Sequence, residues 1–257
     1  MDSQEAAEPA TATAGQVSRP GTPVDRAPRW DLVTGIAGLV FLVLDQLNRL
    51  TPGTPDPQLP VAEYTRQLAA ELGGHQVALW LGFLADAAFM VFLAGLWSRV
   101  RRFEGPAGLF ATALLVAGTV NVAVLLVSRG CYLALVQYGS TGAPDSATLT
   151  TLTWLPSWLG QAQLPAALVE SLAIAAAALT TGALPRWLGW LGGLTAVFAL
   201  LSIGWYIQTA TDGVLGTADS VGSWVSVAFF LAISVVLLVR AGERPKEDPA
   251  PGRAALA

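Results

Sequence analysis

Long apolar stretches alternate with short polar ones along most of this chain. Six of the apolar stretches carry almost no charge, and a polar head and a polar tail flank them. A helix needs about 20 apolar residues to cross the hydrocarbon core of a bilayer. The pattern therefore predicts an all-α, polytopic membrane protein with six transmembrane helices. The expected spans cover residues 30–50, 76–98, 106–128, 152–181, 186–208 and 221–240. Whether the third helix continues to residue 138 is left open.

Composition supports this fold class and narrows the function. Hydrophobic residues make up 53% of the chain and charged residues 12%, whereas soluble domains carry about 25% charged residues. The loops are too short for a separate soluble catalytic domain, and no basic stripe suited to nucleic acid is present. Arginine, alanine and glycine are abundant and Lys246 is the single lysine, which favours a bacterial source.

The positions of the basic residues predict how the chain is threaded. One set of span ends carries Arg26, Arg29, Arg99, Arg101, Arg102, Arg186, Arg240, Arg244 and Lys246. The other set carries Arg49, Arg66 and Arg129. The positive-inside rule places both termini in the cytoplasm, as an even number of spans allows. We expect a multi-pass protein of the bacterial plasma membrane, with disordered tails at residues 1–29 and 241–257.

The longest outer loop contains an amphipathic segment at residues 61–72. Val61, Tyr64, Leu68 and Leu72 recur at helical spacing, with polar residues on the opposite face. Two interpretations are open: a helix that packs on the outer end of the bundle, which we favour, and a helix on the membrane surface with a lid function.

The link between the fourth and fifth spans, residues 184–194, reads LPRWLGWLGGL. Pro185 can end one helix and begin the next. Trp187 and Trp190 suit the membrane interface. Glycines allow helices to approach closely; those of the block are Gly189, Gly192 and Gly193.

This block, with the Pro-rich loop after the first span and the Arg-rich turn after the second, resembles a family of uncharacterised bacterial six-helix membrane proteins. The resemblance covers about residues 30–240. It implies a six-helix integral membrane protein and carries over no activity and no catalytic residues.

Polar residues inside the spans are the best functional clues, because each is costly to place in lipid. They lie at middle to outer depth on several helices: Asp45, Arg49, Asp86, Asn121, Arg129, Gln161, Gln163, Glu170, Ser202, Tyr206, Ser223 and Ser226. We expect Asp45 to pair with Arg49, four residues later. The set predicts either a cavity open to the outside or a buried hydrogen-bond network. The candidate binding residues are Asp45, Asp86, Asn121, Arg129, Gln163 and Glu170.

Three functions fit these residues. The favoured one is a non-enzymatic protein that binds or moves a small solute, an ion or a lipid. A second is an intramembrane enzyme that acts on a lipid or prenyl substrate, with Asp86 and Glu170 as acid and base and aromatic residues such as Trp154, Trp158, Trp205 and Tyr206 around them. A third is a structural or accessory protein, in which the carboxylates only brace the bundle.

Histidine and cysteine chemistry does not contribute to any of these functions. We expect no metal site and no cofactor, because His75 and Cys131 are the single histidine and the single cysteine and metal sites need several such ligands together. His75 is expected at the membrane interface.

Overall fold

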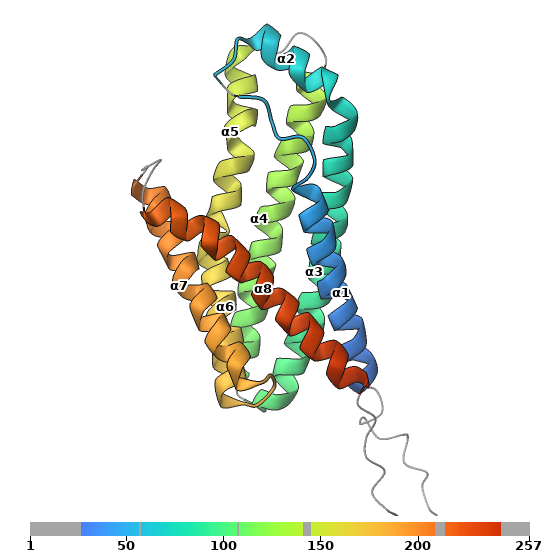
Figure 1. Cartoon of the computed structure of the whole chain (residues 1–257), viewed down its shortest axis with the longest axis vertical. Coiled ribbons are helices and arrows are strands. Elements are labelled where there is room, and N and C mark those ends of the chain that lie inside the picture. The colour runs from blue at the N-terminus through green and yellow to red at the C-terminus, as the bar shows by residue number, and fades with distance from the viewer. Residues whose placement is uncertain (1–26, 57, 107, 141–144, 209–213, 243–257) are drawn as a thin grey trace, which may run out of the picture.

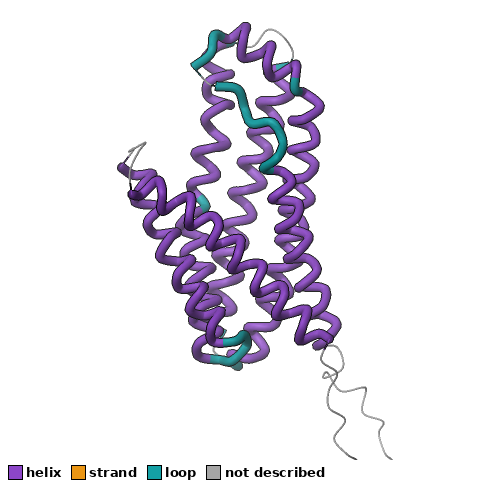
Figure 2. The backbone as a smooth tube through the Cα atoms, in the orientation of Figure 1, coloured by secondary structure: helices purple, strands orange, loops and turns teal. Residues whose placement is uncertain are grey.

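The computed structural model describes residues 27–56, 58–106, 108–140, 145–208 and 214–242. Every regular element in these ranges is an α-helix (Figure 2). The helices are α1 (Ala27–Asn48), α2 (Val61–Ala70), α3 (Leu72–Glu104), α4 (Leu109–Gly139), α5 (Ser146–Ala162), α6 (Leu164–Thr180), α7 (Arg186–Gln208) and α8 (Val214–Gly242). The two predicted tails lie almost entirely outside the described residues.

Six helical stretches of the described chain are long and apolar enough to cross a membrane. α1, α3, α4, α7 and α8 each supply one, and α5 and α6 together supply the sixth. The all-helical, six-span prediction is therefore confirmed. The first residues of α1 and the last residues of α8 lie at the same end of the bundle, at the bottom of Figure 1. We call this end the termini end.

The spanning helices form a closed ring. Among the described elements, α1 packs against α3, α3 against α4, α4 against α6, α6 against α7, α7 against α8, and α8 against α1. α2 and α5 lie toward the other end of the molecule, where α5 packs along α4 (Figure 1). Because the ring closes, polar residues on the inner faces of six different helices can meet in its middle.

The helix predicted at residues 61–72 packs on the end of the bundle away from the termini (Figure 1), and packing on the bundle is what the favoured interpretation predicts. Tyr64 and Leu68 of α2 are buried in a small apolar core with Leu135 of α4 and Leu149 of α5. The Tyr64 hydroxyl also accepts a hydrogen bond of 3.0 Å from the Thr153 hydroxyl. α2 therefore has a buried partner surface within the protein.

Several helices run beyond the predicted spans. α3 begins at Leu72 and ends at Glu104, α4 continues to Gly139, and α8 begins at Val214, seven residues before the predicted start. The apolar pattern marks where lipid contact ends. The helix itself continues wherever its residues still have helical propensity and a surface to pack on.

The predicted fourth span is two helices. α5 ends at Ala162, α6 begins at Leu164, and Gln163 lies between them. Pro165 is the cause, because it has no N–H to donate and its ring clashes with the carbonyl of the preceding turn. Pro156 is accommodated inside α5, and its carbonyl accepts a 2.9 Å hydrogen bond from Ser128 of α4.

The LPRWLGWLGGL block has the predicted structural roles at most of its positions. Trp187 and Trp190 expose more than half of their surface to the outside of the ring, as interface residues would. Gly189 lies against α6, and Gly192 lies against Phe229 of α8 and Ala175 of α6. At both positions an added Cβ would come within 3.2 Å of neighbouring atoms. Gly193 has open space beside it, so the expectation of close approach is wrong at that position.

Candidate functional site

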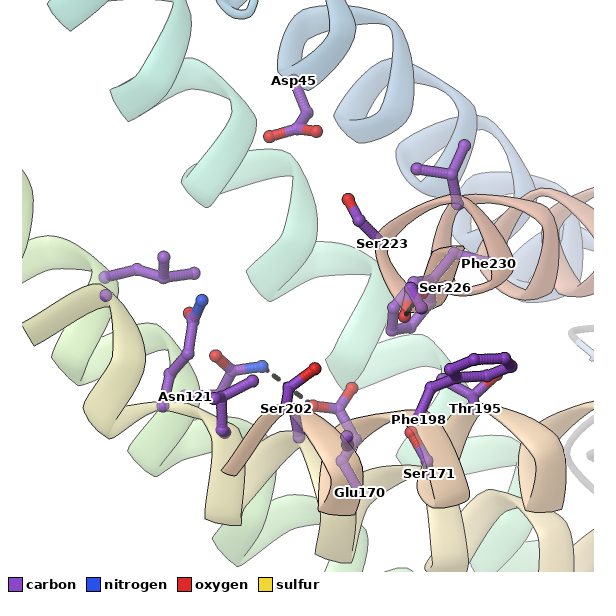
Figure 3. A pocket seen from close by; sticks show the side chains of 18 of the residues that line it. Asp45, Asn121, Glu170, Ser171, Thr195, Phe198, Ser202, Ser223, Ser226 and Phe230 are labelled. Carbon is purple, nitrogen blue, oxygen red and sulfur yellow. Dashed lines mark hydrogen bonds between the residues drawn. The ribbon is translucent and has the colours of Figure 1, made fainter. Parts of the chain in front are cut away.

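A cavity of about 530 Å³ lies inside the helix ring. All six ring helices and the α5–α6 junction contribute side chains to its wall, and Figure 3 shows many of them pointing toward one another across an open space. Every polar residue that the sequence places at middle to outer depth lines this cavity: Asp45, Arg49, Asp86, Asn121, Arg129, Gln161, Gln163, Glu170, Ser202, Tyr206, Ser223 and Ser226. The chain thus gathers groups from six helices in one place.

The cavity extends from the middle of the ring toward the end that lies away from the termini. Arg49 at the end of α1, Tyr206 near the end of α7 and Asp219 near the start of α8 line its outer part. Thr195 of α7 and Phe230 of α8 line its inner part. The inner and outer residues on each helix are separated by about 16 Å, at a rise of about 1.5 Å per residue. The cavity is therefore about half a bilayer deep.

Phenylalanine side chains close the cavity toward the termini end. Phe41 of α1, Phe89 of α3 and Phe230 of α8 line its inner end, with Phe92 and Phe229 packed directly behind them. Ring centroids within this group lie 4.8–6.2 Å apart, the range in which aromatic rings pack favourably. We call these five residues the phenylalanine plug.

Asp86 and Arg129 form an ion pair on one wall. The Arg129 guanidinium donates from Nε to Asp86 Oδ2 at 2.7 Å and from Nη2 to Oδ1 at 3.4 Å. The Asp86 side chain is 1% exposed and that of Arg129 is 18% exposed. The guanidinium lies over Gly82, where an added Cβ would overlap it. Glycine one turn before Asp86 thus makes room for the arginine of α4.

Glu170 and Asn121 form a second, separate pair. Asn121 Nδ2 donates to Glu170 Oε2 at 3.1 Å (Figure 3). The Glu170 residue is 1% exposed. Glu170 Oε1 and Asn121 Oδ1 are buried and receive no hydrogen bond from the described residues. Of the two carboxylates predicted in mid-membrane, Asp86 is thus neutralised by an arginine, and Glu170 is held by an amide alone.

The outer part of the cavity carries a third polar group. Arg49 Nε lies 3.3 Å from Asp45 Oδ2, as the four-residue spacing predicts, and Arg49 Nη1 donates to the Ser223 hydroxyl at 3.2 Å. The Tyr206 hydroxyl is hydrogen-bonded to Asp219. Asp219 is not among the polar residues predicted to lie inside the spans, because it falls in a stretch that the apolar pattern assigns to a loop.

Carboxylates outnumber cations in the cavity. Among its described lining residues, Asp45, Asp86, Glu170 and Asp219 are acidic, and Arg49 and Arg129 are basic. Each arginine is paired with an aspartate. The charge balance of the lining therefore favours a cationic guest over an anionic one.

The geometry gives no support for a bound metal ion. No group of three or more His, Cys, Asp or Glu side chains with metal-binding geometry occurs in the part of the chain that the structure describes.

Gln163 and Gln161 line the cavity at the α5–α6 junction, and their amides can donate hydrogen bonds to an organic guest or accept hydrogen bonds from it.

A buried ionic cluster lies at the termini end, and its residues are not among those predicted to be functional. Arg99 of α3 is buried, pairs with Asp31 of α1, and donates from Nε to the Ala183 carbonyl at 2.8 Å. Arg240 of α8 donates to the same carbonyl at 3.0 Å. Arg102 Nη2 lies 3.6 Å from Asp31 Oδ1. The cluster joins α1, α3, α8 and the link between α6 and α7 behind the phenylalanine plug.

Other expected positions differ from the structure. His75 is fully buried within the protein, and its Nδ1 lies 2.7 Å from the Tyr132 hydroxyl; its place at the membrane interface stays a prediction. Trp154 and Trp158 are exposed on α5 and do not line the cavity, whereas Tyr206 does. The side chain of Trp205 lies outside the described residues. The deep aromatic lining that an intramembrane enzyme would need is therefore not supplied by these two tryptophans.

Comparison of the chain with protein-family models, with curated proteins and with solved structures gives no match. The resemblance of residues 184–194 and their surroundings to a six-helix bacterial family remains a prediction from the sequence.

Proposed function

We propose that this protein binds a small polar solute or ion in the cavity of its helix ring, and that the solute enters from the end away from the termini. The observation that carries the proposal is the convergence of polar groups from all six ring helices on one space of about 530 Å³. Ligand pockets commonly measure about 300–1,000 Å³. A bundle braced only by internal hydrogen bonds would have no need of an open space among them.

The threading and location of the protein are part of the proposal. With both termini in the cytoplasm, as the clusters of Arg99, Arg101 and Arg102 and of Arg240 and its neighbours indicate, the cavity faces the outside of the cell. The composition favours the plasma membrane of a bacterium. The solute would then be one that the cell meets in its surroundings or in its periplasm.

Acid–base catalysis on a lipid is supported less well. That mechanism needs two carboxyl groups free to exchange protons around one substrate. Asp86 is held by both guanidinium contacts of Arg129, so Glu170 is left to act without its partner. The exposed positions of Trp154 and Trp158 also remove two aromatic residues from the expected pocket.

Binding can be tested by filling the cavity. Ser226 lines the cavity on α8, and Ser220 lies exposed on the same helix outside it. The full chain in lipid nanodiscs would be screened for thermal stabilisation by small cations, neutral polar solutes and anions. We expect at least one solute to stabilise the wild type and the Ser220→Phe control but not Ser226→Phe, because the added ring occupies the site.

Two results would contradict the proposal. One is that no solute of any charge class stabilises the wild type. The other is that Ser226→Phe responds to every active solute as the wild type does, which would place the binding outside the cavity. Labelling a cysteine at Ser223 with a membrane-impermeant maleimide, in a Cys131→Ala background and in right-side-out cells, tests the predicted orientation separately.

A further inference from the structure

The inner end of the cavity contains two hydrogen-bond acceptors that nothing satisfies. Asn121 Nδ2 donates a hydrogen bond to Glu170 Oε2. Glu170 Oε1 and Asn121 Oδ1 remain buried without a donor among the described residues. Buried polar atoms in folded proteins are almost always hydrogen-bonded. Two unsatisfied acceptors on residues that line the same cavity can receive hydrogen bonds from a guest that brings N–H or O–H groups.

The charge around these acceptors specifies the guest further. Both arginines of the lining are paired with aspartates, Arg129 with Asp86 and Arg49 with Asp45. Neither pairs with Glu170 in the described contacts. A buried carboxylate without a cation is strongly disfavoured. A positively charged guest with several N–H donors would supply both the missing counter-charge and the missing hydrogen bonds.

The neighbouring aromatic rings suit the organic part of such a guest. Figure 3 shows Glu170, Phe198 and Phe230 around the same space, and Phe41 and Phe89 also line the cavity. Aromatic faces attract a nearby cation and pack against alkyl groups. The volume of about 530 Å³ far exceeds what a bare ion fills, and the described residues hold no metal-type cluster.

From these observations we propose that the cavity recognises an organic ammonium compound with at least one N–H. Its ammonium group is held by Glu170 Oε1 and Asn121 Oδ1, and its carbon skeleton lies against the phenylalanine rings. This inference rests on the proposed solute-binding function and gives that function a substrate class.

The test uses isothermal titration calorimetry on the full chain in lipid nanodiscs with three matched probes. n-Propylammonium carries both the charge and the N–H donors. Propyltrimethylammonium keeps the charge but has no donor, and 1-propanol has nearly the same shape as n-propylammonium without the charge. We expect n-propylammonium to bind at least tenfold more tightly than either of the others. The variant Ser226→Phe measures the partitioning of each probe into the bilayer.

Two variants with the same change of charge locate the binding group. Glu170→Gln keeps the size of the side chain and removes the charge at the inner end, and we expect at least a tenfold loss of n-propylammonium affinity. Glu71→Gln makes the same change of charge at an exposed residue outside the cavity, and we expect less than a threefold loss. Thermal unfolding without ligand shows whether each variant is folded.

The outcomes separate the two proposals. If 1-propanol or propyltrimethylammonium binds as tightly as n-propylammonium, and Ser226→Phe abolishes the binding of both compounds, solute binding stands and the ammonium class is overturned. The same conclusion follows if folded Glu170→Gln retains full affinity. If Glu170→Gln does not fold, the ranking of the three probes on the wild type still decides. If n-propylammonium does not bind, the inference fails outright, and the solute screen then decides whether the cavity binds anything.

Discussion

Removing Arg129 tests the role of the ion pair on the cavity wall. Its guanidinium makes two contacts with Asp86, whose side chain is 1% exposed. Arg129→Gln deletes the positive charge and leaves this carboxylate buried with no cation against it. The reverse change, Asp86→Asn, leaves the guanidinium unpaired, but that group is 18% exposed and faces the cavity.

The size of each effect follows from this difference in burial. Removing one partner of a buried ion pair costs about 3–5 kcal/mol, and we expect Arg129→Gln to fall in this range. Asp86→Asn should cost about half as much, because water in the cavity can solvate the guanidinium that remains. The double variant should be more stable than Arg129→Gln alone, since it no longer buries an unpaired charge.

Equilibrium unfolding of the full chain in mixed detergent micelles, followed by tryptophan fluorescence, measures these free energies. Arg49→Gln is the matched control, because Arg49 pairs with Asp45 at the exposed end of the same cavity and its side chain is 48% exposed. Exposed pairs four residues apart on a helix contribute about 0.3–0.5 kcal/mol. If Arg129→Gln destabilised the protein no more than Arg49→Gln does, the assignment of a buried, neutralised Asp86 would be wrong.

Three further changes probe other contacts. Gly82→Ala places a Cβ 2.7 Å from Arg129 Nε and closer still to Nη1 and Cζ, so unfolding measurements should show a loss of about 1–3 kcal/mol; a neutral result would mean that the arginine can move freely. Glu104 accepts hydrogen bonds of 2.6 and 2.8 Å from two backbone N–H groups in the first turn of α4, and Glu104→Ala should cost about 1–2 kcal/mol. On α2, the hydrogen bond from Arg66 lowers the pKa of Glu63 from 4.5 to about 2, so this pair stabilises the helix above pH 4.5 and loses its effect as the pH falls toward 2. Carboxyl NMR titration should show a midpoint near 2 in the wild type and a higher one in Arg66→Gln, in which the hydrogen bond from Gln67 still lowers the pKa of Glu63.

The spans and the membership of the cavity could be predicted because one physical constraint governs both. A polar side chain in lipid is costly, so residues such as Asn121, Glu170 and Ser202 must turn inward on whichever helix carries them. Their depth follows from counting residues along each span. A closed ring of six helices then brings every such residue to the same interior space.

The pairing of these residues across different helices could not be predicted, whereas the four-residue spacing did predict the pair of Asp45 with Arg49. Arg129 contacts Asp86 rather than Glu170 because of the register of α3 against α4, and this register depends on the small size of Gly82. Asp219 was missed for a different reason. A hydrophobic pattern shows where the chain meets lipid, and α8 continues as a helix for two turns beyond that point.

The burial of Arg99 was also beyond sequence pattern. Its place in a cluster of arginines after a span marks it as a cytoplasmic surface residue, and Arg101 and Arg102 are exposed. Arg99 alone turns inward, because Asp31 and the Ala183 carbonyl are both within its reach. These partners come from α1 and from the link between α6 and α7, so the sequence of any one span does not predict that they contact Arg99.

The contrast between the two ends of the ring bears on whether the protein transports its solute or only binds it. The segment of α8 from Phe230, at the inner end of the cavity, to Arg240, at the termini end, is about 15 Å long. The phenylalanine plug and the Arg99 cluster occupy this length in series. A solute bound at Glu170 would have to open both an apolar seal and a buried ion pair to leave on the far side. Binding from one face needs neither change. The described conformation therefore fits the proposed binding of a solute from one side, and transport would require a second arrangement in which α1, α3 and α8 separate at the termini end.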